Sequence, residues 1–477
     1  MLSDRAKALF PVIQAAFDAG GLDAICELFA KLESRIEGLE KRLNLNSSNS
    51  SKPPSSDGLK RKTKSLRPKN TRRKPGGQPG HPGQTLQQSP APDITHTIAL
   101  DRCPDCGADL RDEPLAREEK RQVFDLPPIA MEVSEHRAQC KWCPACAKWV
   151  TAPFPAEVSA PVQYGHGMQS VMSYLNIAQL LPCERTAEVC QDLFGHRPSA
   201  GSVVRAVARC AEKVTPAVDR IAGVLREAAH LHADETGVRC AGHTEWFHVA
   251  STATHTLYHH GPKRGREGFK AGSVLPDYCG NLITDFWGSY DTLEKCVHSR
   301  CNAHLLRELT SFSEENQRWA EGLIAALLAM KQAADDARQR AQKSIHPATL
   351  KPLLADYARW LTNGLKTHPE VAKPAGKRGR AKQSKAHNLL ARMHQKREEV
   401  LRFAHDLEVP FDNNQAERDL RMIKVQQKIS GCFRSARGAQ IFCAVRSYLS
   451  TTRKHGLNMM DSIKSAFAGK PMDFAPE

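Results

Sequence analysis

The chain is poor in aromatic residues and lacks long apolar runs. Phe, Trp and Tyr make up 6% of its 477 residues. No segment approaches the roughly 20 consecutive apolar residues that a membrane-spanning helix needs. The opening sequence MLSDRAKALFPVIQ also lacks the basic stretch and apolar core of a secretory signal. We therefore expect a cytoplasmic protein with no membrane partner.

Acidic residues are too few to balance the basic ones. The chain has 68 Lys and Arg against 52 Asp and Glu, which gives a formal net charge of +16. Such an excess favours a polyanionic partner, because Lys and Arg that bind phosphates release the counterions condensed on them. Nucleic acid is therefore the first candidate partner, and the length suggests about three or four domains.

Apolar side chains recur at heptad spacing near the start of the chain. Two series with a period of seven, offset by three, consist of Leu22, Phe29, Ile36 and Leu43, and of Ile25, Leu32 and Leu39. Charged residues fill many of the positions between them. This a/d pattern predicts a short coiled coil. The alternative is one amphipathic helix that packs on its own chain.

The composition changes abruptly from Asn44 onward. The stretch NLNSSNSSKPPSSDGLK and the residues after it have almost no apolar side chains and several Pro and Gly. Such a segment cannot form a core, so we expect a disordered linker over residues 45–95. Between Lys60 and Lys74 there are nine Lys or Arg and no acid. This part either contacts the DNA backbone without reading sequence or is a solvated tether.

Two C-P-x-C elements predict a zinc site within residues 96–155. Cys103 and Cys106 form the first element, and Cys143 and Cys146 form the second. Each tight turn offers two thiolates to one half of a tetrahedral Zn²⁺ site. Cys140 lies outside this repeated form, and we interpret it as a bystander. Four unligated structural cysteines are the alternative, whereas the odd total of 15 cysteines argues against a disulfide framework.

The segment between the two cysteine pairs alternates in polarity. Residues 121–140, RQVFDLPPIAMEVSEHRAQC, are expected to form the strands of a zinc ribbon. Helical patterns follow over residues 168–213, with a break at 195–198 and a potential cap at Ser199. This arrangement suggests a DNA-binding helix-turn-helix within residues 160–225, and an ordinary helical hairpin is the alternative.

Three acidic residues lie on elements that suit metal-dependent phosphodiester chemistry. Two divalent ions can run such a reaction, and about three carboxylates from different elements must hold them. Asp234 and Asp285 each end an apolar-led strand pattern, and Glu417 lies on a helix that Asp412 or Asn413 would cap. Mg²⁺, or Mn²⁺, prefers such oxygen ligands. With 52 acidic residues in the chain, spacing alone does not single out these three.

A resemblance to a known family adds to this interpretation. Nearly the whole chain resembles the transposases of the insertion sequence 66 family. The resemblance rests on these segments, in this order: NLNSSNSSKPPSSDG, GGQPGHPG, CPDCG, HADETGVR, LITDFWGSY, CNAHLLREL and FDNNQAERDLRMIKVQQKISGCFRS. The resemblance implies an RNase H-like catalytic core with a DDE triad, an upstream zinc-binding domain and an N-terminal region that binds DNA or oligomerises. It also implies a homo-oligomer and accessory proteins encoded by the same element.

Matched residue by residue, the resemblance assigns the triad. The first aspartate is Asp234 in ADET, the second is Asp285 in TDFWGSY, and the glutamate is Glu417 in NNQAER. These residues would be both catalytic and the ligands of two Mg²⁺ or Mn²⁺ ions. Glu235 is excluded because neighbours on a strand point to opposite faces. Asp412 is set aside as a helix cap.

Other polar residues near the triad have open roles. A basic helix face that follows Glu417 either holds DNA phosphates or is simply solvated, and it consists of Arg418, Arg421, Lys424 and Lys428. His230 and His232 either support the site or belong to the core. His298, Cys301 and His304 resemble metal ligands in spacing, but no fourth ligand is evident. We expect instead a packed helix that carries His304 and Arg307 near the active centre.

The expected architecture is a multidomain α+β protein. It consists of an N-terminal helix or coiled coil (1–44), a basic linker (45–95), a zinc ribbon (96–155), a helix-turn-helix-like region (160–225), an RNase H-like α/β core in two parts (226–302 and 406–460) separated by a helical insertion (303–405), and a C-terminal tail (461–477).

The expected function is DNA transposition by a bacterial, nucleoid-associated enzyme. Water would cleave a phosphodiester at the element end, and the freed 3′ hydroxyl would attack the target strand without a covalent protein intermediate. Its partners would be double-stranded DNA of the terminal repeats and of the target. Two alternatives remain open. One is a catalytically dead repressor or architectural protein, and the other is a nuclease that cannot join strands.

Overall fold

The computed structural model describes residues 4–50, 86–127, 129–373 and 381–474. The chain divides into two units, which are described separately. The large unit contains Met1–Lys64, Pro153–Val189 and Arg197–Glu477, and the small unit contains Ser65–Ala152 and Cys190–His196. Among the described residues, every helix is too short or too polar to cross a membrane.

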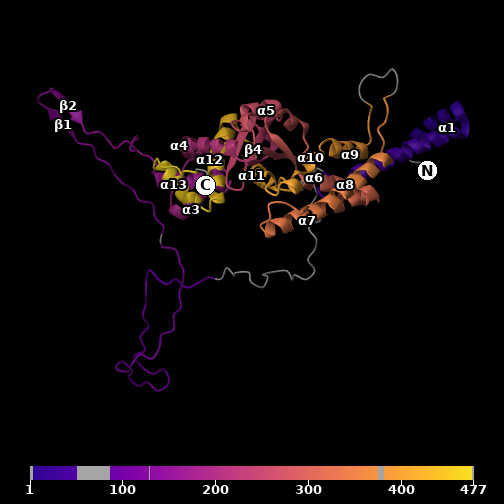
Figure 1. The fold of residues 1–477 in the computed structure, drawn as a ribbon. Coiled ribbons are helices and arrows are strands. Elements are labelled where there is room, and N and C mark those ends of the chain that lie inside the picture. Colours follow the sequence, from indigo (N-terminus) through magenta and orange to yellow (C-terminus); the bar gives the residue numbers. More distant parts are fainter. Residues whose placement is uncertain (1–3, 51–85, 128, 374–380, 475–477) are drawn as a thin grey trace. The chain divides into compact units, whose positions relative to one another are not determined.

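A mixed five-stranded sheet is the centre of the large unit (Figure 1). Its strands are β3 (His230–Cys240), β4 (His243–Ser251), β5 (Thr256–Gly261), β6 (Asn281–Thr284) and β7 (Val297–Arg300). Their order is β5-β4-β3-β6-β7. The strands β3, β6 and β7 run parallel, and β4 is antiparallel to both of its neighbours. The chain thus leaves β3 toward one edge and returns on the other side of β3 to form β6. The boundary between β3 and β6 is therefore a topological switch point.

A tight hairpin joins β3 to β4. Both turn residues have positive φ, 48° at Ala241 and 84° at Gly242. This combination is typical of the two-residue turns whose twist matches that of the flanking strands. The turn fixes the register in which Cys240 pairs with His243 and Asp234 pairs with Val249.

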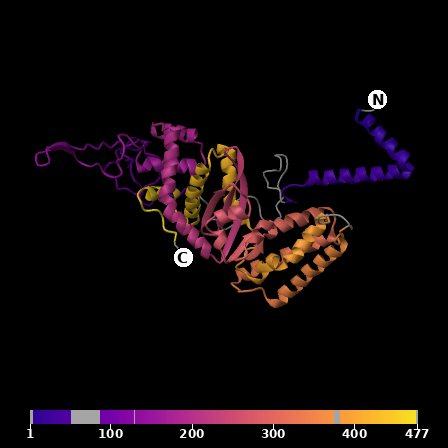
Figure 2. The same ribbon diagram turned by 90° about the horizontal axis from the view of Figure 1, so that it is seen from above.

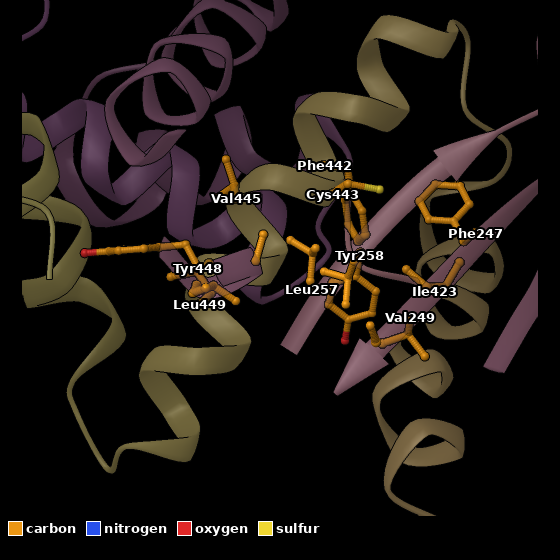
Figure 3. Close-up of a cluster of buried hydrophobic side chains, with 14 of the residues drawn as sticks. Phe247, Val249, Leu257, Tyr258, Ile423, Phe442, Cys443, Val445, Tyr448 and Leu449 are labelled. Atoms are coloured by element: carbon orange, nitrogen blue, oxygen red, sulfur yellow. The ribbon is translucent and has the colours of Figure 1, made fainter. Parts of the chain in front are cut away.

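Two C-terminal helices cover one face of the sheet. Helix α11 (Asn414–Ser430) packs on β3 and β4, and α12 (Ala436–Lys454) packs on β5. Alternation along the strands sends Phe247, Val249 and Tyr258 to this face, where Phe442 and Ile423 meet them (Figure 3). Each such buried side chain contributes roughly 1.5–3 kcal/mol of transfer free energy. Helix α4 (Ala200–Glu227) packs on α12 and completes this core.

Short segments cover the opposite face. Helix α5 (Arg266–Ala271) carries Phe269, whose ring stacks on Tyr290 with centroids 4.8 Å apart. Tyr290 lies in the 3₁₀ turn η4 (Gly288–Thr292), and a second 3₁₀ turn, η3 (Leu275–Asp277), follows α5.

Helices precede the sheet, as the periodicity predicts. They are α2 (His166–Ser173), which continues as the π-helical turn η2 (Tyr174–Ala178), then α3 (Cys183–Phe194) and α4. The break before α4 includes Gly195 at φ 69°. Ser199 caps α4, because its hydroxyl accepts a hydrogen bond from the backbone N–H of Ser202.

A helical insertion separates β7 from α11. It is a bundle with its own core, and Figure 2 shows its helices side by side: α6 (Asn302–Glu314), α7 (Arg318–Gln339), α8 (Pro347–Thr367), α9 (Lys385–Gln395) and α10 (Arg397–His405). The ends of the insertion meet at Asn302. Its backbone N–H donates to the carbonyl of Phe411 at 3.0 Å, and its Nδ2 donates to the carbonyl of Val400 at 2.9 Å.

The C-terminal residues differ from the expected tail. Helix α13 (Met459–Phe467) buries Ile463 and Phe467, and Phe474 is only 1% exposed. These side chains join the same core as α4 and α12. Part of the segment 461–477 that the sequence analysis describes as a tail is therefore helical and packs in this core, and the periodicity of so short a segment gives little indication of its burial.

The N-terminal helix α1 (Asp4–Asn44) is kinked. Gly20 and Gly21 have non-helical backbone angles inside it, and the heptad pattern begins directly after them. The heptad side chains Leu22, Phe29 and Ile36 are exposed, at 73%, 54% and 55%. An apolar seam is therefore present on one helix, and the coiled coil stays a prediction.

The small unit contains one two-stranded sheet among its described residues. Strand β1 (Cys140–Cys143) pairs antiparallel with β2 (Lys148–Thr151). The predicted strands over 121–139 do not form in the described part of this segment, and Val123 and Val133 are about 90% exposed there. Alternation without a partner strand is not sufficient for a strand. The basic part of the linker, Lys60 to Lys74, lies outside the described residues.

Candidate active site

Asp234 lies on β3, and Asp285 directly follows the neighbouring parallel strand β6. The ladder between β3 and β6 ends with the pair His232 and Ile283. Continued by two residues, the same register brings Asp234 beside Asp285, one residue beyond the end of β6. Because ligand sites of open α/β sheets lie at the carboxyl ends of strands at a switch point, this is the expected position for a site.

Glu417 reaches the same region from a helix. It lies in the first turn of α11, which packs on β3 and β4. Two side chains of α6 face its carboxylate. His304 Nδ1 and Arg307 Nη2 each lie 3.7 Å from a Glu417 oxygen. The α6 side chains His304 and Arg307 therefore lie beside the acid, as the sequence predicts.

Asn413 fastens the start of α11 to β3. Its Nδ2 donates to the carbonyl of Ala233 at 2.8 Å, and its Oδ1 lies 2.8 Å from His232 Nδ1. Its backbone N–H donates to the Cys301 sulfur at 3.1 Å. Asn413 is 1% exposed. The sequence suggests it as a helix cap. It does occupy the N-cap position of α11, but its side chain makes no capping hydrogen bond, and the Asp412 carboxylate accepts from the N–H of Asn414 at 3.0 Å.

The electrostatics of the site favour a cation. Burial raises the pKa of Asp234 well above its ordinary value, and the negative charges of Glu235, Asp285 and Glu417 raise it further, against a hydrogen bond from the Glu235 N–H that lowers it. Among the described residues, the buried Oε1 of Glu417 has no hydrogen-bond partner. Repelling carboxylates with an unsatisfied oxygen fit Mg²⁺ or Mn²⁺, which take oxygen ligands.

Glu235 has a different environment. Its carboxylate accepts hydrogen bonds from Tyr290 and from Arg264, whose Nη2 lies 2.8 Å away. The guanidinium of Arg264 stacks over Trp287 at 4.0 Å. Burial raises the pKa of Glu235, although Tyr290 and Arg264 oppose the shift. Its partners lie on the face of the sheet opposite α11.

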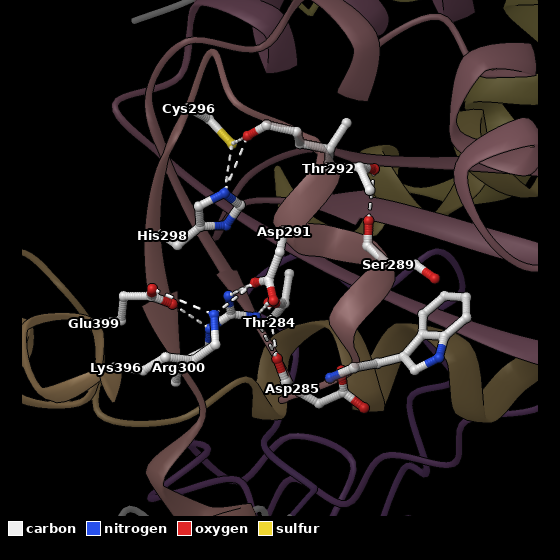
Figure 4. A network of polar contacts seen from close by, with 12 residues as sticks. Thr284, Asp285, Ser289, Asp291, Thr292, Cys296, His298, Arg300, Lys396 and Glu399 are labelled. Atoms are coloured by element: carbon white, nitrogen blue, oxygen red, sulfur yellow. Dashed lines mark hydrogen bonds and ion pairs between the residues drawn. The ribbon is translucent and has the colours of Figure 1, made fainter. Parts of the chain in front are cut away.

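Arg300 joins the strand end that carries Asp285 to the helical insertion (Figure 4). Its side chain is fully buried and forms ion pairs with Asp291 and Glu399. It also donates to Thr284 Oγ1 at 3.2 Å and to the carbonyl of Asp285 at 3.0 Å. These bonds fix the backbone from which the Asp285 side chain projects.

The histidines and the cysteine that the sequence analysis names near the triad have different surroundings. His298 lies away from Glu417, with its Nε2 3.0 Å from the carbonyl of Leu293. Cys301, His304 and Glu417 offer ligand atoms within 4.8 Å of one another. Since Glu417 belongs to the acidic site, this cluster is part of that site. His230, further from the acids along β3, interacts with the side chain of Asn281 at 3.2 Å.

The predicted basic face of α11 is solvent-exposed. Its members are Arg418, Arg421, Lys424 and Lys428. Lys424 Nζ also donates to the carbonyl of Gly237 at 2.6 Å, and burial lowers the pKa of this lysine. The other, exposed side chains of this face can contact DNA phosphates, and such contacts do not depend on the DNA sequence.

The four predicted zinc ligands form two separate pairs. Hydrogen bonds between Cys103 and Cys106, and between Cys143 and Cys146, lower the pKa of the first thiol of each pair. Within the described residues, the four sulfurs do not gather into one group. The donor chemistry of each pair nonetheless fits half of a zinc site. Cys140 is exposed at the start of β1.

These features define a class of protein. An acidic, cation-favouring site at the switch point of a helix-covered mixed sheet, together with paired cysteines in a separate unit, is typical of metal-dependent enzymes that act on nucleic acids. Comparison with protein families identifies the group: residues 161–441 match the family described as "Transposase IS66 family". The chain belongs to the IS66 family of transposases.

Two further family matches cover the N-terminal part. Residues 101–147 match the "zinc-finger binding domain of transposase IS66", which supports structural zinc at the two cysteine pairs. Residues 21–87 match a family of unknown function, DUF6444. A search of curated proteins finds no match.

Proposed function

We propose that this chain is a DDE-type DNA transposase, which cuts at the ends of its insertion element and joins them to target DNA. One observation carries the proposal: Asp234 on β3, Asp285 directly after β6 and Glu417 on α11 interact electrostatically, and burial together with the other acids disfavours the charged form of Asp234. The family match over 161–441 includes all three residues. We further propose that the core is RNase H-like, which its mixed, helix-covered sheet supports.

In this proposal the three carboxylates hold two Mg²⁺ or Mn²⁺ ions. When bound, the ions supply activation of the attacking oxygen and stabilisation of the leaving oxygen. The residues around them orient the acids: Asn413 holds the start of the Glu417 helix on β3, and Arg300 holds the backbone of Asp285. Arg307 beside Glu417 balances part of the negative charge.

Two in-line transfers make up the reaction. In the first, water attacks a phosphodiester at the element end, its proton passes to solvent, and the 3′ oxygen leaves as a hydroxyl. In the second, this 3′ hydroxyl attacks a target phosphodiester, a new P–O bond forms, and another 3′ oxygen leaves. A protein nucleophile is not required for either transfer.

The other regions of the chain would serve DNA binding and oligomerisation. The exposed basic face of α11 begins directly after Glu417 and would contact phosphates near the acids. The helices α2 to α4 would serve DNA binding as a helix-turn-helix-like region. The exposed apolar seam of α1 would serve a homo-oligomer by forming a coiled coil. The enzyme would act on bacterial nucleoid DNA, together with any accessory proteins of its element.

Cleavage and strand transfer on labelled element-end DNA test the proposal. Wild type is compared with Asp285→Asn in Mg²⁺ or Mn²⁺, and DNA binding is measured for both. We expect wild type to give joined products, and the variant to bind equally and not to cut. Asp277→Asn, an exposed acid in a surface pair with Lys295, is the matched control and should cut normally.

Other outcomes favour the alternatives. Cutting without joined products would favour a nuclease. Binding without cutting by wild type, with the accessory proteins of the element supplied, would favour a repressor or architectural protein. Loss of DNA binding in Asp285→Asn with the fold intact would contradict a catalytic role for this acid.

A further inference from the structure

A second cluster of metal-ligating side chains lies at the far end of β3. Cys240, Glu245 and His260 offer a sulfur, an oxygen and a nitrogen within 4.8 Å of one another. The three residues come from β3, β4 and β5, and strand alternation sends all of them to the face that α11 and α12 cover. Cys240 is six residues beyond Asp234, on the order of 20 Å along the strand, so this cluster is separate from the acidic site.

The cluster is largely buried, and one polar atom each of Glu245 and His260 lacks a hydrogen bond of normal geometry among the described residues. The side chains of His260 and Glu245 are 2% and 19% exposed, and Cys240 is fully buried. Glu245 Oε2 and His260 Nε2 lie 2.7 Å apart, yet neither atom has a hydrogen bond of normal geometry within the described residues. Unsatisfied polar atoms of this kind destabilise a fold unless a ligand completes them.

A fourth donor lies on the loop between α11 and α12. The backbone N–H of Phe433 donates to the carbonyl of Arg239 at 3.0 Å, and its carbonyl accepts from the N–H of Ala241 at 2.9 Å. These two bonds flank Cys240 and bring Cys432, the residue before Phe433, beside it. Cys432 is exposed, and its sulfur is not among the ligand atoms that already lie within 4.8 Å of one another, so a rotation of its side chain is part of the inference.

The donor atoms of the cluster match zinc. Burial, a hydrogen bond with Glu245 and the charges of Glu245 and Cys432 together raise the pKa of Cys240 to about 11, so this thiol keeps its proton until an ion displaces it. Thiolate and imidazole ligands favour Zn²⁺ over Mg²⁺ or Ca²⁺.

We infer that Cys240, Glu245, His260 and Cys432 form a tetrahedral Zn²⁺ site, distinct from the zinc-finger domain. Binding would release the two thiol protons to solvent. The ion would join the β3–β4 hairpin to the loop that ends α11. It therefore would fix the C-terminal end of the helix whose first turn carries Glu417.

The aromatic surroundings fit such a closed structural site. The Phe247 ring lies 5.0 Å from the His260 ring and 5.1 Å from the Phe433 ring, centroid to centroid. Apolar walls exclude water and strengthen the binding of an ion inside them.

Zinc content of the full chain tests the inference. A background variant with Cys103→Ser and Cys143→Ser disables the zinc-finger site, and bound zinc is then measured by mass spectrometry after dialysis. We expect about one equivalent per chain in this background. Adding Cys432→Ser or His260→Gln should remove it, whereas adding Glu417→Gln should leave it, since Glu417 belongs to the acidic site.

Cys279→Ser is the matched control for Cys432→Ser, because both thiols are exposed. It should retain the zinc, and circular dichroism checks that each variant is folded. The inference is overturned if the folded background binds no zinc, or if Cys432→Ser or His260→Gln keeps its full zinc content. Since the readout is bound zinc, failure here would leave the proposed transposase activity untouched.

Discussion

The side-chain oxygen of Asn413 lies 2.8 Å from Nδ1 of His232, and this contact joins the start of α11 to β3 beside Asp234. Asn413 also donates to the carbonyl of Ala233 at 2.8 Å. The contact with Ala233 is buried and the contact with His232 is partly buried, and together they hold the helix in one position relative to the strand. The spacing between Asp234 and Glu417 therefore depends on Asn413.

Replacing Asn413 should displace Glu417 and leave DNA binding unchanged. Asn413→Ala leaves the carbonyl of Ala233 without its donor, which we expect to cost about 1–3 kcal/mol of stability. A displaced Glu417 should lower cleavage by roughly 10²-fold, because small misplacements of reacting groups cost that much. Cleavage rates and DNA affinity measure the effect, and the affinity should stay unchanged. Asn414→Ala, at the next position, is the control, and equal cleavage by both variants would contradict the role of Asn413.

Arg300 should be essential for stability near Asp285. Arg300→Met leaves Asp291 and Glu399 without their buried partner, and breaking such a pair costs about 3–5 kcal/mol. Urea unfolding of the metal-free chain measures the loss. The control is Arg359→Met, which removes an exposed pair with Asp356 and should cost about 0–1 kcal/mol. Similar losses for the two variants would show that the buried network adds little.

Stability should fall at mildly acidic pH through His248. Burial lowers the pKa of His248 to about 4, the neighbouring charges of His259, His260 and Arg264 act in the same direction, and only the bond to the Lys263 carbonyl opposes them. The folded state thus keeps the imidazole neutral while the unfolded chain takes up a proton below its ordinary value of 6.5. This contribution is complete above pH 6.5 and is lost as the pH falls toward 4, by up to about 3 kcal/mol.

Unfolding curves from pH 7 to pH 4 measure this dependence. His248→Gln removes the titrating group and should flatten part of the decline. The exposed His394→Gln should leave the decline as in wild type. An unchanged slope in His248→Gln would mean that another group takes up the proton.

Two helical glycines should respond oppositely to alanine. A Cβ at Gly322 would lie 2.2 Å from Cδ2 of Trp360, where α7 packs on α8, so Gly322→Ala should destabilise by about 1–3 kcal/mol. A Cβ at Gly223 in α4 meets nothing nearer than 3.9 Å, so Gly223→Ala should stabilise by up to about 1 kcal/mol. Thermal unfolding of the two variants decides the matter. Stabilisation by both would mean that the α7–α8 contact adjusts freely.

Local patterns predicted some elements and tertiary contacts decided others. Asp234 and Asp285 each follow a short apolar strand pattern that is readable along the chain, but among 52 acidic residues the family resemblance was needed to single them out. The partners of Asn413 lie on strand β3 and beside β7, so no local pattern reveals them. The same holds for Cys240 and His260, which meet only through the strand register.

Burial at chain ends and pairing of isolated strands were the weakest predictions. Phe474 is buried because its ring packs against Tyr448 of α12 and against His455, and the sequence near the end of the chain gives no sign of these contacts. Residues 121–139 alternate in polarity, yet they have no neighbouring strand in the described structure. A strand pattern needs a partner and a core, and sequence shows neither.

The meeting of both ends of the helical insertion at Asn302 has an evolutionary consequence. Since the insertion begins and ends at one point of the fold, helices can be gained, lost or lengthened there while Asp285 and Glu417 keep their places. Because the bundle has its own hydrophobic core, its sequence can evolve independently of the sheet that carries the acids. A transposase built in this way can acquire new contacts with DNA or with other proteins at this point, and its chemistry is inherited unchanged.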